Sequence, residues 1–421
     1  MSIYSISATN AFARLQASLS PGLRDGLEAA VDAADNLGFT LYLAGGSVRD
    51  LVLRRSAVDL DVMTEGDSLE LAEAVAARTG GDVKVYGRFA TTCVLSGRSR
   101  IDIARARTES YSRPGALPDV QPGPLQDDLA RRDFTINAMA LGLAGPHKAL
   151  LLDPEGGMAD LEAGIIRVIH DGSFVDDSTR ILRGLRYSAR LWFSIEPETA
   201  RLMKSQAAYL ESISGSRLRT ELHFLLGDVR PWRSLEQAGS LGVLGALVSG
   251  LGWDQERSAV ARTLTGLRPT ERSSQLLVLL ASSLTARGVE ELITRISLGV
   301  RESRLARQSI RFAQRVSEAE GRASVELALS LSDVEPSVIS AMSALLLEPD
   351  DAASLTAMIR ARPRLRGDDL MALGLNEGPA IGLVLTELRR AAMAGTVTTR
   401  DDELALARKL IDSLSRDKQD S

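Results

Sequence analysis

The stretch LYLAGGSVRDLVLRRSAVDLD, Leu41–Asp61, decides the fold of this chain. A short apolar run leads to Gly45-Gly46 and a basic segment, and a second apolar run contains Asp59-x-Asp61. Alternate residues of a strand project to one side, so we expect both carboxylates on the same face. Carboxylates this close repel each other unless a cation lies between them, and Mg²⁺ prefers oxygen ligands. The pattern therefore indicates a metal site.

The glycine pair adds a candidate phosphate contact. Gly45 and Gly46 permit a tight turn whose backbone N–H groups face a phosphate, with a helix N-terminus behind it. Ser47-Val48-Arg49 excludes a Walker loop, which requires Gly-Lys-Ser/Thr there. A plain strand-to-helix turn and a solvated aspartate pair remain alternatives for each motif alone. Turn, helix and paired aspartates in this order favour a metal–nucleotide site.

Composition limits the class of protein. The 421 residues suffice for two to four domains, and 44% hydrophobic with 25% charged residues is typical of a globular chain. Cys93 is the single cysteine, and neither a signal peptide nor a membrane-spanning run is evident, so we expect a cytoplasmic protein with no membrane partner. The net charge of −5 argues against nonspecific coating of nucleic acid, but it permits a basic stripe that binds RNA.

The periodicity predicts an α+β fold, with a small mixed sheet followed by helices. Strands are expected at 40–44, 59–63, 82–86, 90–95 and 100–106. Early helices are expected at 21–37, at 47–55 and from a Ser68 cap to Gly80, and later ones at 174–193, 198–209 and 216–226. Residues 112–126, rich in proline and glycine, are expected to form a loop.

Asp102 is a further acidic candidate. It lies between Ile101 and Ile103, so alternation turns the isoleucines into the core and the carboxylate the other way. If its strand lies beside the Asp59–Asp61 strand, Asp102 is a third acidic group at the metal site. An ordinary exposed face is the alternative.

Arg131–Ala140, RRDFTINAMA, places polar side chains among apolar ones. Such groups must find partners where they are buried. Arg131 and Arg132 are candidates for triphosphate contact. Asp133 and Asn137 suit either a nucleotide site or a structural network.

The segment DDSTRILRGLRYSAR indicates base selection. Asp177 stands at a helix start, and Arg180, Arg183 and Arg186 form a cationic face. A fixed Asp accepts from the exocyclic amine of cytosine or adenine, while an Arg donates to the adjacent ring nitrogen. Uracil and guanine present the reverse pattern and would leave polar groups unpaired. A capping Asp with exposed arginines is the structural alternative.

Farther along, five arginines share one helical stripe with Glu302 as the only acid in the run. They are Arg301, Arg304, Arg307, Arg311 and Arg315. Like charges on one stripe repel unless phosphates neutralise them, which favours RNA contact over a solvated face. Gly367–Gly382 contains a glycine-rich turn before a helix, another candidate phosphate contact.

These stretches together resemble the class II tRNA nucleotidyltransferases (CCA-adding enzymes) and bacterial poly(A) polymerases, within the DNA polymerase β-like superfamily. The resemblance is strong over residues 40–230, where LAGGSVRDLVLRRSAVDLDVMTEG, RRDFTINAMAL and DDSTRILRGLRYSARLWF look like three of the family's ordered motifs. It implies a catalytic head at 1–150, a neck that selects the base at 151–235, and a body and tail that contact tRNA at 236–330 and 331–421.

The resemblance also implies roles for individual residues. Asp59 and Asp61 would hold two Mg²⁺ ions, Asp177 and Arg180 would read the base, and the phosphates would be contacted by Gly45, Gly46, Arg49, Arg131 or Arg132, with support from Arg183 and Arg186. Asp102 is the further catalytic candidate from its strand position. Ser47, Asp133 and Asn137 are further nucleotide-binding candidates from their place in the motifs.

The implied activity is addition of C and A to tRNA 3′ ends from CTP and ATP, and no protein partner is implied. Arg54 stands where the family usually has glycine, and Asp176 where it usually has glutamate. Gly87-Arg88-Phe89 meets the pattern of the poly(A) polymerase subgroup only in part. A poly(A) polymerase and a noncatalytic RNA-binding protein with the same fold are the alternatives.

Overall fold

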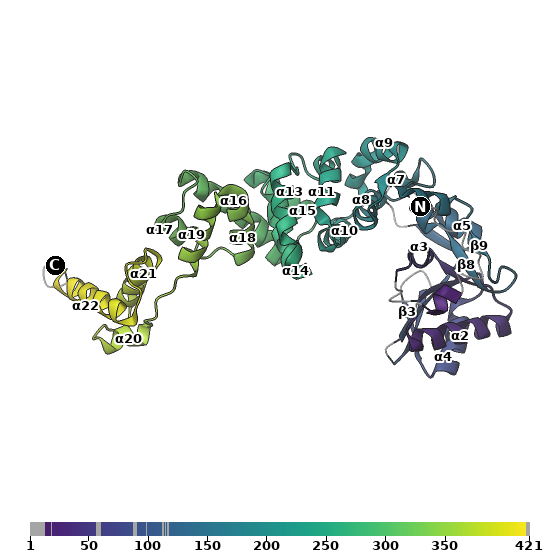
Figure 1. The fold of residues 1–421 in the computed structure, drawn as a ribbon, viewed down its shortest axis with the longest axis horizontal. Coiled ribbons are helices and arrows are strands. Elements are labelled where there is room, and N and C mark those ends of the chain that lie inside the picture. The colour runs from purple at the N-terminus through teal and green to yellow at the C-terminus, as the bar shows by residue number, and fades with distance from the viewer. Residues whose placement is uncertain are drawn as a thin grey trace. The chain divides into compact units, whose positions relative to one another are not determined.

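A computed structural model describes residues 13–417, except 18, 56–59, 87–90, 98, 112, 114, 116 and 117. The chain forms two compact units, residues 1–246 and residues 247–421. The first contains the mixed sheet and the second is helical throughout its described part, so the predicted α+β class is confirmed (Figure 1). The finer division into head, neck, body and tail stays a prediction.

The first unit contains a seven-stranded sheet in the order β3-β4-β5-β2-β1-β8-β9. The bounds of its strands are β1 Leu41–Ala44, β2 Leu60–Thr64, β3 Asp82–Tyr86, β4 Thr91–Ser96, β5 Ser99–Arg105, β8 Ala140–Ala144 and β9 Leu151–Leu152. β2 and β5 are parallel, with Asp61 opposite Asp102. Both carboxylates therefore project from one face of the sheet, as strand alternation predicts.

The opposite face of the sheet is the core. Ile101 and Ile103 are buried there, as predicted for the neighbours of Asp102. The helices α2 (Pro21–Leu37) and α4 (Ser68–Thr79) cover this face and pack on each other (Figure 1). The α2 backbone comes so close that a Cβ on Gly26 would lie 2.4 Å from Ile101 Cδ1. This packing fixes the face to which Asp61 and Asp102 are restricted.

Two local predictions were wrong. Asp67, not Ser68, caps α4, because its carboxylate accepts from the N–H groups of Leu69 and Glu70 at 2.8 and 3.1 Å. Residues 112–126 are not all loop: β7 (Asp119–Pro122) pairs with β6 (Arg107–Ser110), and α5 (Leu125–Ala130) follows. Tertiary pairing stabilises a hairpin that the proline and glycine content conceals.

The predicted helix at 174–193 is interrupted at Asp177. α7 (Ser173–Asp176) ends there and α8 (Thr179–Leu191) begins two residues later, since Asp177 has extended backbone angles. The predicted 198–209 helix is α9 (Pro197–Gln206) continued by the 3₁₀ segment η2 (Ala207–Ser212). The other elements of this unit are α3 Gly46–Val52, η1 Thr135–Asn137, α6 Gly157–Ala163, β10 Ile165–Ile166, β11 Ser194–Ile195, α10 Gly215–Gly227, α11 Pro231–Ser240 and α12 Val243–Leu247, which crosses the unit boundary.

The second unit consists of packed helices. They are α13 Gln255–Thr263, η3 Leu264–Gly266, α14 Pro269–Ala281, α15 Ala286–Arg295, α16 Val300–Glu318, α17 Val325–Ser330, α18 Pro336–Leu346, α19 Pro349–Arg360, α20 Gly367–Ala372, α21 Pro379–Met393 and α22 Arg400–Asp417. α16 packs on α14 and α18, and its Leu305, Phe312 and Val316 are buried. No described helix combines the length and apolar character needed to cross a membrane.

Candidate active site

The acidic face of the sheet carries Asp61 and Asp102 on its neighbouring strands β2 and β5. Asp61 is exposed on β2, and Ser47 Oγ, at the start of α3, donates to its Oδ2 at 3.4 Å. Asp102 accepts twice from Arg100 Nε, at 2.9 and 3.0 Å. Asp59 lies outside the described residues. The described part of the chain contains no group of three or more acidic, histidine or cysteine residues that could hold a metal, and metal binding by Asp59 and Asp61 stays a prediction.

Position 45 requires glycine because the Arg132 side chain approaches its backbone closely. It has φ of 73°, and its N–H donates to Met139 O at 3.0 Å, which ties the turn to the chain before β8. A Cβ at this position would lie 2.1 Å from Arg132 Nη1. Any other residue would therefore push Arg132 away. Gly46 begins α3 beside it.

Arg49 is buried and engaged within the protein. Its Nη1 donates to Asn137 Oδ1 at 2.6 Å, its Nε and Nη2 donate to Asp50 at 2.9 Å, and it lies over the Tyr187 ring at 5.2 Å. Arg49 thus joins α3, η1 and α8. A direct contact between Arg49 and the triphosphate stays a prediction.

A cavity of about 430 Å³ lies within the first unit. Its lining includes eight of the predicted nucleotide-binding residues, Gly46, Arg131, Arg132, Asp133, Asn137, Asp177, Arg180 and Arg183. The other lining residues are Arg107, Glu109, Tyr111, Pro118 and Tyr187. The predicted Gly45, Ser47, Arg49 and Arg186 are not in this lining. Residues predicted from three separate motifs therefore meet at one concave site.

A buried ion pair forms one wall of the cavity. Arg183 donates to Asp133 Oδ2 from Nε and Nη2, at 2.9 and 2.6 Å, while Asn137 Nδ2 donates to Oδ1 at 2.9 Å. Burial raises the pKa of Asp133, but the charge and hydrogen bonds of Arg183, the hydrogen bond of Asn137 and the charge of Arg180 together outweigh burial, so the pKa lies below its ordinary value. The charge of Asp133 raises the pKa of Arg183 in turn. Asp133 and Asn137 thus hold the structural network that was one of their two predicted roles.

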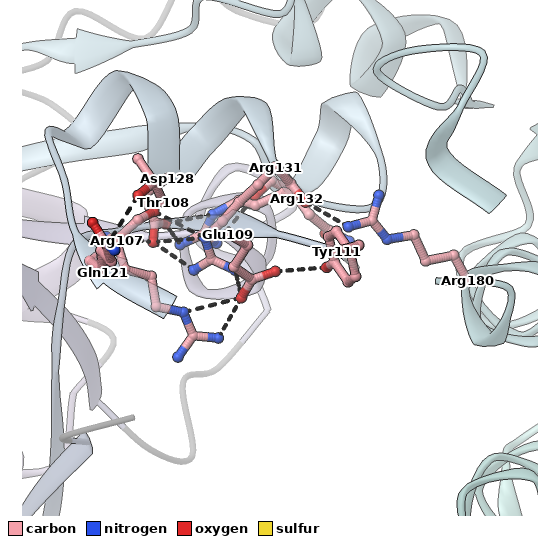
Figure 2. Close-up of polar contacts among 10 residues, drawn as sticks. Arg107, Thr108, Glu109, Tyr111, Gln121, Asp128, Arg131, Arg132 and Arg180 are labelled. Atoms are coloured by element: carbon pink, nitrogen blue, oxygen red, sulfur yellow. Dashed lines mark hydrogen bonds and ion pairs between the residues drawn. The ribbon is translucent and has the colours of Figure 1, made fainter. Parts of the chain in front are cut away.

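A second network of charges surrounds Arg131 and Arg132 (Figure 2). Arg131 donates to Asp128 Oδ1 at 2.5 Å and to Glu109 Oε1 at 2.8 Å, and Arg132 donates to Asp128 Oδ2 at 3.0 Å. Glu109 also accepts from Arg107 at 2.7 Å and from the Tyr111 hydroxyl at 2.7 Å. Two carboxylates therefore hold three arginines and a tyrosine at the cavity.

Arg180 is buried and connects this network to α8. Its Nη1 donates to Ser173 Oγ at 2.8 Å, and its Nη2 donates to the backbone oxygen of Arg131 at 2.6 Å (Figure 2). The position of one predicted base-reading group thus depends directly on the segment that carries Arg131.

Asp177 caps the start of α8, the structural alternative considered for it, while base reading stays a prediction. Its Oδ1 accepts from Thr179 N at 3.1 Å and Thr179 Oγ1 at 2.7 Å, as in a helix cap, and from Arg217 Nη2 at 2.9 Å. Its Oδ2 makes no hydrogen bond within the described part of the chain, so one oxygen fixes the side chain and the other can accept from a ligand.

Arg186 lies beside the cavity among aromatic rings. Its guanidinium carbon is 5.3 Å from the centre of the Tyr187 ring and 5.1 Å from that of Phe224. Tyr187 also lies edge-on to Phe134, at 6.0 Å. Arg186 therefore helps to hold Tyr187, which is itself a lining residue.

Comparison with known proteins identifies the family. Residues 41–167 match the poly A polymerase head domain, and residues 192–252 match the probable RNA and SrmB-binding site of polymerase A. A CC-adding tRNA nucleotidyltransferase of Deinococcus radiodurans is 31% identical over 365 residues, which cover 86% of this chain and 87% of that protein. The chain belongs to the tRNA nucleotidyltransferase family.

Two further relatives of this tRNA nucleotidyltransferase family member differ from each other in how much of their length this chain covers. An A-adding enzyme of Geobacter sulfurreducens is 32% identical over 405 residues, which cover 90% of this chain and 46% of that protein, so the chain spans less than half of that relative. A Thermotoga maritima CCA-adding enzyme complexed with tRNA is 27% identical, with a TM-score of 0.78 over 96% of this chain and 98% of that one.

In this family member each arginine of the α16 stripe is paired with a carboxylate. Arg307 pairs with Glu290 of α15 at 2.6 Å, and Arg315 pairs with Glu318 of α16 itself at 2.9 Å. Arg311 pairs with Asp333, while Arg301 and Arg304 share Glu335, so four carboxylates face five arginines. The reasoning that only phosphates would relieve repulsion along the stripe was wrong, because carboxylates of the protein relieve most of it. RNA contact by the five arginines stays a prediction.

Sequence reasoning missed four lining residues that carry charge or a hydroxyl near the cavity: Arg107, Glu109, Tyr111 and Tyr187. Three of them lie on or next to β6, in RARTESY, a run of alternating charge that precedes the segment taken for a loop. A charged strand directly after the Asp102 strand was the available signal.

Proposed function

We propose that this protein adds C, A or both to the 3′ end of tRNA from CTP and ATP and releases pyrophosphate. The observation that carries the proposal is the single cavity in which Asp177 and Arg180 meet the arginines of the RRDFTINAMA segment. Gly46 of that lining is followed by Ser47, which contacts Asp61. A nucleotide in this cavity would thus have its base near Asp177 and its phosphates toward Asp61 and Asp102 on the acidic face of the sheet.

Base selection follows from the polar groups that remain available. Asp177 Oδ2 can accept from the exocyclic amine of cytosine or adenine, and the buried guanidinium of Arg180 can donate to the adjacent ring nitrogen. Ser173 and the Arg131 backbone hold Arg180 in place. A base with a carbonyl and an N–H at these positions would face the wrong partners.

Triphosphate binding is supported by the charge of the lining. Arg107, Arg131, Arg132, Arg180 and Arg183 face the carboxylates Glu109, Asp133 and Asp177, an excess of two positive charges. The carboxylates hold the guanidinium groups in fixed positions, so little ordering is needed when the phosphates arrive. Arg131 and Arg132 are the proposed contacts.

The carboxylate oxygens on the acidic face of the sheet are ligands that fit Mg²⁺. Asp61 is exposed and lies opposite Asp102 on the neighbouring parallel strand, and both offer hard oxygen ligands. Asp59, by strand alternation, is the proposed third ligand. When bound, Mg²⁺ would lower the pKa of the attacking 3′-hydroxyl and neutralise charge on the α-phosphate. The lining residues of the cavity would hold the nucleotide beside this acidic face.

Which nucleotides are added is the open part of the proposal, since the relatives are named A-adding, CC-adding and CCA-adding. An incorporation assay tests it, using tRNA transcripts that lack one, two or three terminal nucleotides, each with CTP, ATP or both. We expect incorporation to stop at the CCA end. Long A tails on unrelated RNA would instead indicate a poly(A) polymerase.

A substitution separates catalysis from RNA binding. Asp61→Asn should lower the rate of incorporation by about 10³-fold or more while the dissociation constant for tRNA stays within about twofold, because the carboxylate acts at the reacting phosphate. Asp82→Asn, an exposed aspartate of β3, is the control. A noncatalytic RNA-binding protein would show no incorporation in the unaltered chain.

A further inference from the structure

Tyr111, directly after β6, contributes an aromatic ring to the wall of the nucleotide cavity. Asp177 and Arg180 line the same cavity. These two side chains suit the polar edge of a base, but a base also has two flat faces, which bind best against another aromatic ring. An aromatic ring in the same cavity as the base-reading pair is therefore a candidate for stacking.

The Tyr111 hydroxyl is held by a nearly buried carboxylate. It donates to Glu109 Oε2 at 2.7 Å, and the Glu109 side chain is only 6% exposed. Glu109 Oε1 accepts from Arg107 and Arg131, at 2.7 and 2.8 Å, so the carboxylate is itself held in place. Burial, and then the hydrogen bond and charge of Glu109, raise the pKa of Tyr111, which therefore remains a donor at neutral pH. The ring is thus restrained before a nucleotide binds.

The same hydrogen bonds connect the ring to the base-reading side of the cavity. Arg180 Nη2 donates to the backbone oxygen of Arg131 at 2.6 Å, and Arg131 Nη1 donates to Glu109 at 2.8 Å. Tyr111 binds the other oxygen of that carboxylate. In Figure 2 the Tyr111 ring is drawn between Glu109 and the Arg180 guanidinium. The network that positions Arg180 therefore also positions the ring.

Tyr187 is the other aromatic residue among the described lining residues, and its ring is already packed. The guanidinium carbons of Arg49, Arg183 and Arg186 lie 5.2, 6.0 and 5.3 Å from its centre. Within the described part of the chain, no ring or guanidinium group packs on Tyr111 in this way. The ring of Tyr111 is thus better suited than that of Tyr187 to receive a base.

We propose that the ring of Tyr111 stacks on the base of the bound nucleotide, whose edge Asp177 and Arg180 read. In this role Glu109 is a positioning residue, since it acts through the Tyr111 hydroxyl. The proposal rests on the proposed function, which puts a base beside Asp177. Tyrosine loses little conformational freedom on binding, and every base has an aromatic face, so stacking adds affinity for cytosine and adenine alike.

Equilibrium binding of CTP and ATP to the full chain in the presence of Mg²⁺ tests the stacking. Tyr111→Leu removes the ring and should raise both dissociation constants about tenfold or more. Tyr111→Phe should stay within about threefold of the unaltered chain, because a phenyl ring stacks in the same way. Tyr209→Leu, which alters an exposed tyrosine of η2 outside the lining, is the control and should bind as the unaltered chain does.

Inorganic triphosphate separates stacking from a general disturbance of the cavity. It offers the phosphates of a nucleotide without a base, so Tyr111→Leu and the unaltered chain should bind it with equal affinity. A loss of affinity for inorganic triphosphate as large as that for CTP would overturn the proposal. A loss of CTP affinity in Tyr111→Phe as large as in Tyr111→Leu would do the same, because the hydroxyl and not the ring would then be the important group.

Incorporation into tRNA distinguishes this proposal from the proposed function. With tRNA that lacks one or more terminal nucleotides, Tyr111→Leu should raise the KM for the added nucleotide about tenfold. If the unaltered chain extends tRNA and Tyr111→Leu keeps its affinity for CTP and ATP, stacking by Tyr111 is wrong and the proposed function stands. If the unaltered chain extends no tRNA but Tyr111→Leu alone loses nucleotide affinity, the proposed function is wrong and the stacking stands.

Discussion

At the residue scale, single residues at or next to the cavity make several contacts at once, and we propose that Asp177 adds a ligand contact to these. Asp177 uses Oδ1 to cap α8 and to bind Arg217, and leaves Oδ2 for a ligand. Gly45 forms the turn and also makes room for Arg132. Substitution of such residues has consequences that differ from atom to atom, and matched variants can separate them.

Asp177→Asn should relax base selection. An amide can keep the Oδ1 contacts, but it presents a donor in place of Oδ2, which suits the carbonyl of uracil or guanine. We expect the preference for CTP over UTP, measured as the ratio of kcat/KM values, to fall about 10²-fold or more. Thr179→Val, which removes only a hydroxyl contact to Oδ1, should keep the preference. Unchanged rejection of UTP and GTP by Asp177→Asn would refute the base-reading role.

The backbone conformation of Arg54 shows why related proteins usually have glycine at this position. It follows the C-terminus of α3 with φ of 57°, the left-handed conformation that glycine adopts most easily at this position. Arg54→Gly should therefore stabilise the fold by about 0.5–1 kcal/mol, the relieved strain exceeding the added freedom of the unfolded chain. Urea unfolding measures the change. Arg55→Gly, outside the left-handed region, should destabilise, and a loss of stability in Arg54→Gly would contradict the strain.

At the element scale, α8 holds the cavity together because it contacts the RRDFTINAMA segment at two points. It carries Arg180, which binds the Arg131 backbone, and Arg183, which binds Asp133. The β6–β7 hairpin contributes Glu109 from the other side (Figure 2). The cavity therefore depends on contacts among α8, α5 and the hairpin rather than on any one of them.

The pair Asp133–Arg183 should dominate the stability of this region. Asp133→Asn leaves Arg183 without its carboxylate, and we expect a loss of about 3–5 kcal/mol at neutral pH. Since the pKa of Asp133 is lowered in the fold, its contribution is complete above the unfolded pKa of about 4 and is lost as the pH falls toward the folded pKa.

Urea unfolding of the unaltered chain and Asp133→Asn at pH 7, 5 and 3 measures this effect. The difference between the two should be equal at pH 7 and 5 and smaller at pH 3. Asp82→Asn, exposed on β3, serves as the control with little effect at each pH. A difference that grew on acidification would contradict the lowered pKa.

At the scale of the whole molecule, net charge is a poor guide to RNA binding. The chain carries 50 basic and 55 acidic residues, yet the first unit places five arginines around one cavity. The α16 stripe shows the reverse, because its five arginines are paired with four carboxylates in the fold. The local pairing of charges, rather than the net charge of the chain, determines where a polyanion can bind.

Affinity for tRNA should fall steeply with salt despite the net charge of −5. Each phosphate neutralised by the protein releases counterions, so we expect the dissociation constant to rise about 10²-fold or more between 50 and 200 mM salt. Filter binding across this range gives the slope, with the melting temperature as a control for the fold. A slope near zero would contradict phosphate contacts as the main source of affinity.

Much of the fold follows from local pattern. Strand alternation correctly placed Ile101 and Ile103 in the core and Asp102 opposite them, and the left-handed glycines Gly38 and Gly80 ended their helices as expected. These features depend on neighbours along the chain, which periodicity and capping preferences report directly. The β6–β7 hairpin was missed because its stability comes from pairing across a segment rich in proline and glycine.

The sequence by itself determined which residues had chemistry to offer: the acidic strand, the glycine turn, the RRDFTINAMA segment and the Asp177–Arg180 pair. Only the tertiary structure decided how each is used. In the fold, Arg49 donates hydrogen bonds to Asn137 and Asp50, and every arginine of the α16 stripe pairs with a carboxylate. The physical reason is that the free energy of a charge depends on burial and on partners, and both come from elements distant in sequence.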